Sequence, residues 1–216
     1  MWQVRPLYFE EVIIAIFLHT GDLPASVTFA GDIAVDTEAM GLNNHRDRLC
    51  VVQLSDGQGD EHLVQFPPGQ YHAPNLCKLL ADPSRVKLFH FARFDVAILE
   101  KYLGVRTAPI YCTKIASRLV RTFTDRHGFK DLCRDLLQVE VSKQQQSSDW
   151  GQGALSPEQQ EYAASDVRHL HRLREKLDVM LAREGRTDIA AECFHFIPTR
   201  ARLDLLGWPE IDIFAH

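Results

Sequence analysis

The sequence predicts one α/β domain, in which helices pack on a sheet that contains both parallel and antiparallel strands. The chain has 216 residues, 45% of them hydrophobic, which is enough for one substantial core. Short apolar segments typical of strands come first, and helical patterns follow almost throughout after about residue 113. We expect a single domain over residues 12–200, a loose extension at residues 1–11, and an apolar tail at residues 201–216.

The first half of the chain is predicted to contain most of the strands. They are expected at residues 13–18, 33–37, 48–54, 61–65 and 86–91, where apolar and β-branched residues lie between turn residues. A short helix should follow Pro74 and end before Asp82, because proline is favoured in a first turn and Pro83 cannot continue a helix. A second helix is predicted from the "ARFDVAILEKYLG" segment, closed by Gly104.

The clearest helix start in the second half is "SPEQ". Ser156 is expected to cap the helix, Pro157 to occupy its first turn, and Gln159 to complete a capping box three residues after the cap. The helical pattern continues to about Glu184, and its length predicts a break near Ser165.

Charge and cysteine content restrict the partners and the compartment. A net charge of −5 and a pI of about 6.0 do not favour a long basic groove, so a nucleic-acid partner should be short or held through metal. The five cysteines form no CxxC pair, which is typical of a reducing cytosol. No apolar run near the start approaches the roughly 20 residues of a membrane span. We expect a cytoplasmic protein without a membrane partner.

Acidic residues follow two of the predicted strands. Asp36 and Glu38 are one residue apart on a buried strand, so they point to the same side and repel unless a cation lies between them. Asp95 follows the 86–91 strand, at the strand end where open α/β sheets place ligands. The alternatives are a solvated strand end for the pair and a helix-dipole contact for Asp95.

A third acidic segment is "EYAASD", in which Tyr162 and Asp166 are four residues apart on one helical face. A Tyr–Asp surface pair is the alternative. Carboxylates from three separated segments suit hard divalent cations, which take oxygen ligands. Two such ions can clamp the attacking and leaving oxygens of a phosphodiester during in-line displacement.

The segments "DTE", "HFARFD" and "YAASD" resemble, in order and spacing, the three motifs of the DEDD superfamily of 3′→5′ exonucleases. The tyrosine four residues before the last aspartate resembles the Tyr subclass. "QQQSSDW" and "LSPEQQEYAASDVRHLHRL" resemble the ribonuclease D branch, and the resemblance extends from about residue 20 to the end. It implies a ribonuclease H-like fold with a mixed sheet flanked by helices. Phe91 departs from the pattern, because many relatives carry Asn there.

The resemblance implies a role for each motif residue. Asp36 would bridge two Mg²⁺ or Mn²⁺ ions, Glu38 and Asp166 would complete the first site, and Asp95 would hold the second ion directly or through water. Tyr162 would orient the attacking water and help to deprotonate it.

Further similarities suggest a very short substrate. Ribonuclease D proper carries helical RNA-binding domains after its catalytic core, and we expect no such domain in the short stretch after about residue 200 of this sequence. Met40 and Leu42 match oligoribonuclease, where the leucine wedges between the two bases of a dinucleotide; a core leucine is the alternative for Leu42. "HRDRLCVVQLS", "CTKIASRL" and "SKQQQSSDW" resemble the nano-RNase C family of bacterial dinucleotide-degrading enzymes. His90 is also expected to contact the substrate.

Three other features concern binding and assembly. Lys114, Arg118 and Arg121 form a basic helical face, from which we expect Arg118 to contact the substrate; a solvated face is the alternative. Trp150 is expected in the core, with stacking on the substrate as the alternative. The apolar tail predicts either packing on its own domain or a subunit contact, and members of the nano-RNase C family form closed octameric rings. We therefore expect a homo-oligomer, an octamer by this resemblance.

The sequence thus predicts a metal-dependent 3′→5′ exoribonuclease that hydrolyses 5′-phosphorylated dinucleotides to nucleoside monophosphates. One alternative is ribonuclease D-like trimming of longer RNA or DNA 3′ ends. A second alternative is a catalytically inactive nucleotide-binding or scaffold protein on the same fold.

Overall fold

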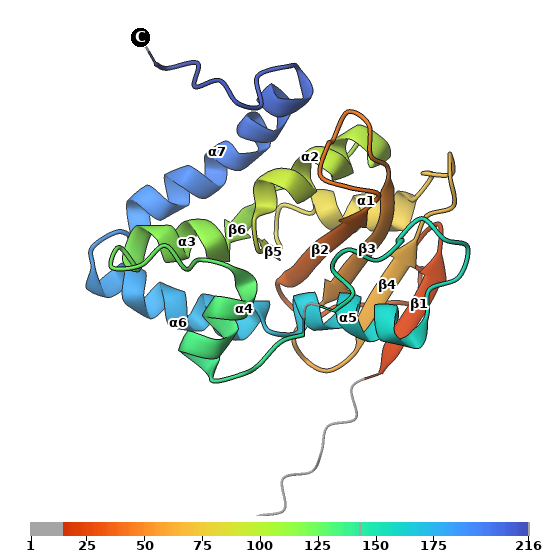
Figure 1. Ribbon diagram of the computed structural model, residues 1–216, viewed down its shortest axis with the longest axis horizontal. Helices are drawn as coiled ribbons and strands as arrows, with labels where there is room; N and C mark the ends of the chain where they lie inside the picture. The colour runs from red at the N-terminus through yellow and green to blue at the C-terminus, as the bar shows by residue number, and fades with distance from the viewer. Residues whose placement is uncertain (1–14, 143, 216) are drawn as a thin grey trace, which may run out of the picture.

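The computed structural model describes residues 15–142 and 144–215, and it forms a six-stranded sheet flanked by helices (Figure 1). The extension predicted at residues 1–11 lies outside the described residues. The strands are β1 (Ile16–Thr20), β2 (Ile33–Ala39), β3 (Leu49–Ser55), β4 (Glu61–Gln65), β5 (Lys87–Phe89) and β6 (Ile110–Cys112). The helices are α1 (Pro74–Ala81), α2 (Ala92–Leu103), α3 (Thr113–Val120), α4 (Phe129–Leu132), a π-helical turn (Cys133–Leu137), α5 (Pro157–Arg168), α6 (Leu170–Arg183) and α7 (Thr187–Leu205).

The sheet is mixed, as the sequence predicts, with the strand order β1-β4-β3-β2-β5-β6. β2, β3 and β4 pair antiparallel, whereas β1 runs parallel to β4, and β5 and β6 run parallel to β2 and to each other. Every residue of β3 is buried. A small cluster that includes Trp150 and Ala163 packs on Cys50 and Val51, while Val52 and Leu54 belong to the larger core. Burial on both faces explains why β3 is apolar almost throughout.

The predicted helix ends are largely confirmed. Ser156 caps α5 through a capping box: its hydroxyl accepts the Gln159 N–H, and the Gln159 side chain accepts the Ser156 N–H at 3.0 Å. Gly104 closes α2 in the left-handed conformation, with φ at 65°. Local interactions of this kind are visible in sequence because their partners lie within a few residues.

Several boundaries differ from the prediction. β1 ends at Thr20 and β2 at Ala39, beyond the predicted limits at residues 18 and 37, and β5 covers only Lys87–Phe89 of the predicted strand at 86–91. The break expected near Ser165 lies at His169 instead, because the Ser165 hydroxyl donates to the Tyr162 carbonyl at 2.7 Å, a contact compatible with continuous helix. β6 is a strand of three residues, too short to give a periodic signal. Residues 201–205, assigned to the tail, form the last turn of α7. In the described part of the chain, no helix is long and apolar enough to cross a membrane.

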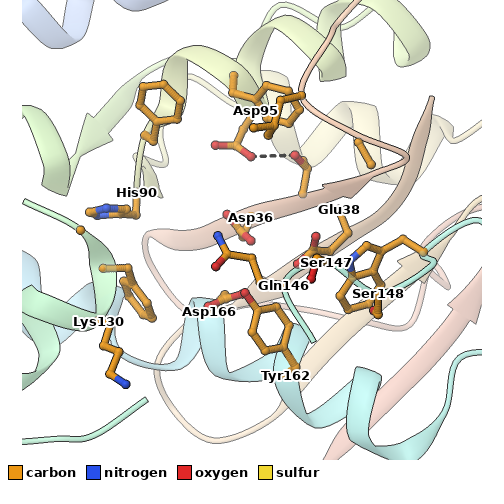
Figure 2. A pocket seen from close by; sticks show the side chains of 18 of the residues that line it. Asp36, Glu38, His90, Asp95, Lys130, Gln146, Ser147, Ser148, Tyr162 and Asp166 are labelled. Atoms are coloured by element: carbon orange, nitrogen blue, oxygen red, sulfur yellow. Dashed lines mark hydrogen bonds between the residues drawn. The ribbon is translucent and has the colours of Figure 1, made fainter. Parts of the chain in front are cut away.

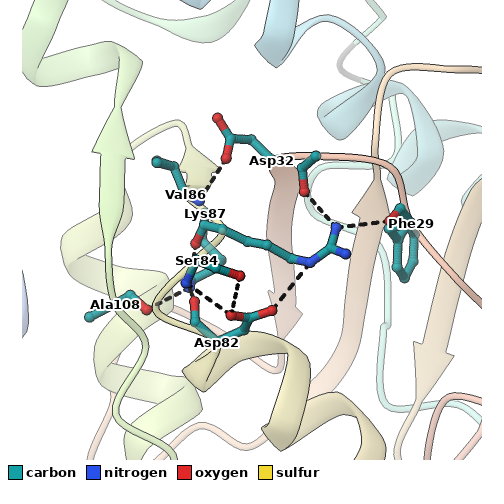
Figure 3. Close-up of polar contacts among 9 residues, drawn as sticks. Phe29, Asp32, Asp82, Ser84, Val86, Lys87 and Ala108 are labelled. Atoms are coloured by element: carbon teal, nitrogen blue, oxygen red, sulfur yellow. Dashed lines mark hydrogen bonds and ion pairs between the residues drawn. The ribbon is translucent and has the colours of Figure 1, made fainter.

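A buried lysine joins the two loops that lead into β5 and β6 (Figure 3). The ammonium group of Lys87 donates to the carbonyls of Asp82, Arg85 and Ala108 at 2.6, 2.6 and 2.5 Å. Burial disfavours its charge and lowers the pKa of Lys87 to about 8. The contacts fix the start of β5 against the loop before β6, and β5 leads directly to His90 in the cavity described next.

Candidate active site

A cavity of about 680 Å³ lies where β2 and β5 end (Figure 2). Its walls come from the end of β2 and the residues after it, the start of α2, α3, the α4 segment, residues 144–150 and α5. Eight of the nine residues predicted to be catalytic or to contact substrate line it: Asp36, Glu38, Met40, Leu42, His90, Asp95, Tyr162 and Asp166. The fold therefore brings together side chains from segments more than 100 residues apart in the chain.

Three of the four predicted carboxylates converge closely. Asp36 and Glu38 project from the same face of β2, and Asp166 projects from α5, which packs against that strand. Each of the three offers one carboxylate oxygen, and these oxygens all lie within 4.8 Å of one another. Oxygen donors at this separation can share one divalent cation.

Asp95 lies beside this trio in the first turn of α2. It is only 3% exposed, and its Oδ1 accepts a hydrogen bond of 2.6 Å from the Thr37 hydroxyl. Thr37 lies on β2 between Asp36 and Glu38, so the hydrogen bond joins the start of α2 to the strand that carries the trio. Asp95 is close enough that its charge raises the pKa of both Asp36 and Glu38.

Burial and mutual repulsion make the ionised cluster unfavourable. Burial raises the pKa of Asp36 well above its usual value, and the charges of Asp95, Asp166 and Glu38 raise it further. The pKa of Glu38 is raised well above its usual value by burial and then by Asp166 and Asp95. Burial raises the pKa of Asp95 to about 7. Buried oxygen donors that repel one another fit a hard divalent cation, since it supplies the missing positive charge.

Tyr162 stands at the edge of the cluster on α5, with its ring centroid 5.9 Å from that of Trp150. Burial raises its pKa, as do the negative charges of Asp166, Glu38 and Asp36 and a hydrogen bond with Asp166. The phenol is therefore held in its protonated form when these carboxylates are ionised, and it can donate a hydrogen bond. Trp150 is 2% exposed, which confirms the predicted core position, although its edge also lines the cavity.

Met40 and Leu42, both predicted to contact the substrate, are exposed at the cavity. Leu42 is 86% exposed and Met40 is 51% exposed, and both follow the end of β2. The alternative of a core leucine at position 42 is therefore wrong.

His90 has a fixed ring orientation. Its Nδ1 lies 2.9 Å from the Thr113 hydroxyl, and that hydroxyl donates to the Phe89 carbonyl at 3.2 Å. The Thr113 hydroxyl therefore lies between the imidazole ring and the backbone of β5, and it holds the ring at the edge of the cavity.

The basic helical face divides into three environments. Arg118 is exposed on α3, and it is not one of the described residues that line the cavity. Lys114, one helical turn earlier, does line it, with its ammonium 4.0 Å from the centroid of the Phe91 ring. Arg121 is 3% exposed and forms an ion pair with Asp135 at 2.5 Å.

Two further lining residues were not predicted as site residues. Gln146 reaches from residues 144–150 toward Asp36 and Asp166 in Figure 2, and Lys130 projects from the α4 segment. The polar run before Trp150 was the sequence signal for Gln146. Lys130 carried no such signal, because its position depends on how α4 packs.

Phe91, the departure from the motif pattern, has an unusual backbone. It precedes α2 in the left-handed conformation, with φ at 71° and ψ at 40°. Asparagine tolerates this conformation better than a bulky aromatic residue does, which explains an Asn preference at this position. The Phe91 ring contacts Lys114 rather than a carboxylate.

Comparison with known proteins agrees with this geometry. A family profile described as 3′-5′ exonuclease matches residues 21–182. Ribonuclease D of Gluconacetobacter diazotrophicus is 38% identical over 160 residues, which cover 74% of this chain and 40% of the relative. This chain thus matches about two-fifths of the length of that curated relative.

Two solved structures cover nearly the whole of both chains. Brucella melitensis NrnC bound to pGG is 55% identical with a TM-score of 0.91, covering 94% of this chain and 99% of the other. Brucella melitensis NrnC with bound Mg²⁺ is 54% identical with a TM-score of 0.90, covering 94% and 100%. With the DEDD carboxylates and the tyrosine in one cavity, the chain belongs to the 3′-5′ exonuclease family, among the relatives of ribonuclease D and NrnC.

Proposed function

We propose that this protein is a 3′→5′ exoribonuclease that hydrolyses very short RNA, chiefly 5′-phosphorylated dinucleotides, to nucleoside monophosphates. The observation that carries the proposal is one cavity in which an exposed Leu42 faces the same space as four carboxylates, of which Asp95 is buried and Asp36, Glu38 and Asp166 are half-buried. Family membership supports exonuclease chemistry, and a 55% identical relative bound to pGG supports a short ligand.

The carboxylates are proposed to hold two divalent ions, Mg²⁺ or Mn²⁺. Asp36, Glu38 and Asp166 would hold the first ion. Asp95 would hold the second ion, and Asp36 would contact both ions. Such a pair supplies an activated water and stabilises the leaving oxygen of the phosphodiester. The 54% identical relative with bound Mg²⁺ supports the choice of ion.

Tyr162 is proposed to orient the attacking water. In the metal-free protein its raised pKa keeps the hydroxyl protonated beside ionised carboxylates, so it can donate a hydrogen bond to that water. The expectation from the sequence that Tyr162 also helps to deprotonate the water stays a prediction.

The substrate is proposed to lie between the exposed leucine and a basic residue. Leu42 would separate the two bases, with Met40 beside it, and His90 would contact the sugar–phosphate backbone. Lys114 is the better candidate for the 5′-phosphate than Arg118, because its side chain lines the cavity. An ammonium group at this position would favour a short, 5′-phosphorylated ligand over an unphosphorylated one.

The C-terminal segment is proposed to form a subunit contact in a homo-oligomer, an octamer by resemblance. Leu206, Ile211 and Phe214 are 64%, 55% and 72% exposed, which is unusual for large apolar side chains so close together. A cut after Gly207 tests this more cleanly than one after Arg202, because Asp204 forms ion pairs with Arg93 and Arg200. Light scattering that reports the 24.6 kDa monomer for the intact chain would overturn the proposal.

Substrate length is tested by rates on 5′-phosphorylated RNAs of two, three and seven nucleotides with Mg²⁺. Faster hydrolysis of the dinucleotide than of the longer RNAs supports the proposed function. Loss of hydrolysis in the Asp36→Ala variant shows that the activity belongs to this protein and not to a contaminating nuclease. Equal or faster cleavage of the seven-nucleotide RNA would favour end trimming of longer chains. No hydrolysis of any of them would favour the inactive alternative.

A further inference from the structure

The segment that carries Leu42, residues 40–48, is held by contacts that lie outside the cavity. A leucine that is 86% exposed can separate two bases only if its backbone is already fixed, because ordering it on binding would cost affinity. The contacts of this segment therefore bear on how the protein recognises its substrate.

Asp47 is the centre of these contacts. It is 6% exposed, and its carboxylate accepts the N–H of Asn43 at 3.0 Å, while its own N–H donates to the Asn43 carbonyl at 2.7 Å. These two hydrogen bonds close a turn immediately after Leu42. The Asp47 carboxylate also lies so close to Gly41 that a Cβ at position 41 would collide with it.

The same turn is attached to the end of α2. The Tyr102 hydroxyl donates to the Asp47 carbonyl at 3.1 Å, and the Lys101 ammonium donates to the carbonyls of Asn44 and His45 at 2.6 and 2.9 Å. These contacts fix the turn against the end of α2, the helix that also carries Asp95.

A further contact reaches the end of α7. His45 Nε2 lies 3.1 Å from the Asp204 carbonyl, and because a carbonyl only accepts, Nε2 is the donor. Asp204 is itself held by Arg93 of α2 at 2.5 Å and by Arg200 at 2.9 Å. The turn after Leu42, the start of α2 and the end of α7 thus share one network.

We propose that Asp47 is a positioning residue that holds Leu42 in place before substrate arrives. Asp47 does not line the cavity, so it acts through the backbone of the turn and not by touching substrate. The inference rests on the proposed function, since it assigns to Leu42 a contact with the bases of a dinucleotide.

The test uses the full-length protein and two substrates. One is a 5′-phosphorylated dinucleotide, and the other is the methyl ester of thymidine 5′-monophosphate, a phosphodiester that has a single base and no second ring for Leu42 to separate. Asp47→Ala should raise KM for the dinucleotide about threefold to tenfold, the cost of ordering a side chain on binding. The dinucleotide kcat and both ester parameters should stay within about twofold of wild type. Asp47→Asn keeps the Oδ oxygen that accepts the Asn43 N–H and should restore most of the affinity.

A double-mutant cycle separates positioning from a general structural role. In the Leu42→Ala background, Asp47→Ala should add no further rise in KM, because the side chain that it positions is gone. Arg46→Met is the matched control: Arg46 contacts the same carboxylate, but its side chain is 75% exposed, and its removal leaves the turn closed by Asn43.

Three results would overturn the proposal: an unchanged dinucleotide KM in Asp47→Ala, additive effects in the cycle, or a parallel loss of ester hydrolysis. If Asp47→Ala does not fold, Lys101→Met tests the same turn from α2, with the same expected rise in KM and the same refuting results. If wild type cleaves the ester but not the dinucleotide, the proposed function fails, and this inference fails with it.

Discussion

Replacing Asp95 by Asn is expected to stabilise the metal-free protein at neutral pH and to abolish hydrolysis. Asp95 is 3% exposed, and burial raises its pKa from 3.8 to about 7. Asparagine keeps an Oδ1 atom that can accept the 2.6 Å hydrogen bond from Thr37, so the packing of α2 on β2 should survive. What the substitution removes is the ionisable group.

The sign and size of the effect follow from proton linkage. The pKa of Asp95 is higher in the folded state than in the unfolded state, so the folded protein is favoured while Asp95 is protonated. This contribution to the free energy of unfolding is fully present below pH 3.8 and is lost as the pH rises to about 7. At about 1.4 kcal/mol for each pH unit, the whole loss is about 4 kcal/mol, of which about 2 kcal/mol falls between pH 5 and pH 7, because the slope flattens as the pH reaches the folded-state pKa. The raised pKa values of Asp36 and Glu38 act in the same direction.

Urea unfolding at pH 5, 6, 7 and 8 in the presence of a chelator measures this directly. Wild type should lose stability across the series, whereas Asp95→Asn should lose less and should exceed wild type at pH 8. Glu192→Gln, an exposed substitution on α7, is the control for loss of one negative charge and should follow wild type. The reasoning is refuted if wild type is equally stable at pH 5 and pH 8, or if Asp95→Asn is the less stable protein at pH 8.

Three further predictions concern activity. Asp36→Ala, Glu38→Ala and Asp166→Ala should each abolish measurable hydrolysis without loss of folded structure, because each removes an oxygen donor from a repelling cluster; Mg²⁺-dependent rates and circular dichroism check this. Tyr162→Phe should lower kcat about 100-fold, the scale for removing one oriented donor, with dinucleotide affinity unchanged in equilibrium binding. Leu42→Ala should weaken dinucleotide binding by about 1–3 kcal/mol, the scale of a lost base-stacking contact, and unchanged affinity would contradict the wedge.

The sequence predicted those parts of the fold whose signals are local. The limits of β4 and α1 agree with the prediction, since strand alternation and proline placement act within a few residues. β6 was missed because it gains its strand character by pairing with β5, which lies more than 20 residues earlier. Non-local pairing of this kind leaves little trace in a segment of three residues.

The candidate site was also predicted only where the signal is local. Alternation along β2 placed Asp36 and Glu38 on one side, and a spacing of four placed Tyr162 and Asp166 on one face of α5. The same spacing could not separate Lys114 from Arg118, which also lie four apart on one helix. Lys114 lies in the first turn of α3, directly after β6, and it lines the cavity, whereas Arg118 lies one turn further along. The point where β6 ends and α3 begins was not predicted, and the sequence analysis therefore chose Arg118.

The electrostatics of the cavity also predict how metal and pH act together. In the metal-free protein, a rise in pH ionises Asp36, Glu38 and Asp95 against burial and mutual repulsion, which lowers stability. A divalent cation needs these groups in their ionised form, so protons and metal compete for the same carboxylates. Added Mg²⁺ should therefore raise the free energy of unfolding more at pH 8 than at pH 5, and this difference should be smaller in Asp95→Asn, which keeps Asp36 and Glu38 but lacks one competing carboxylate. Equal stabilisation by Mg²⁺ at both pH values would mean that the ion binds elsewhere on the protein.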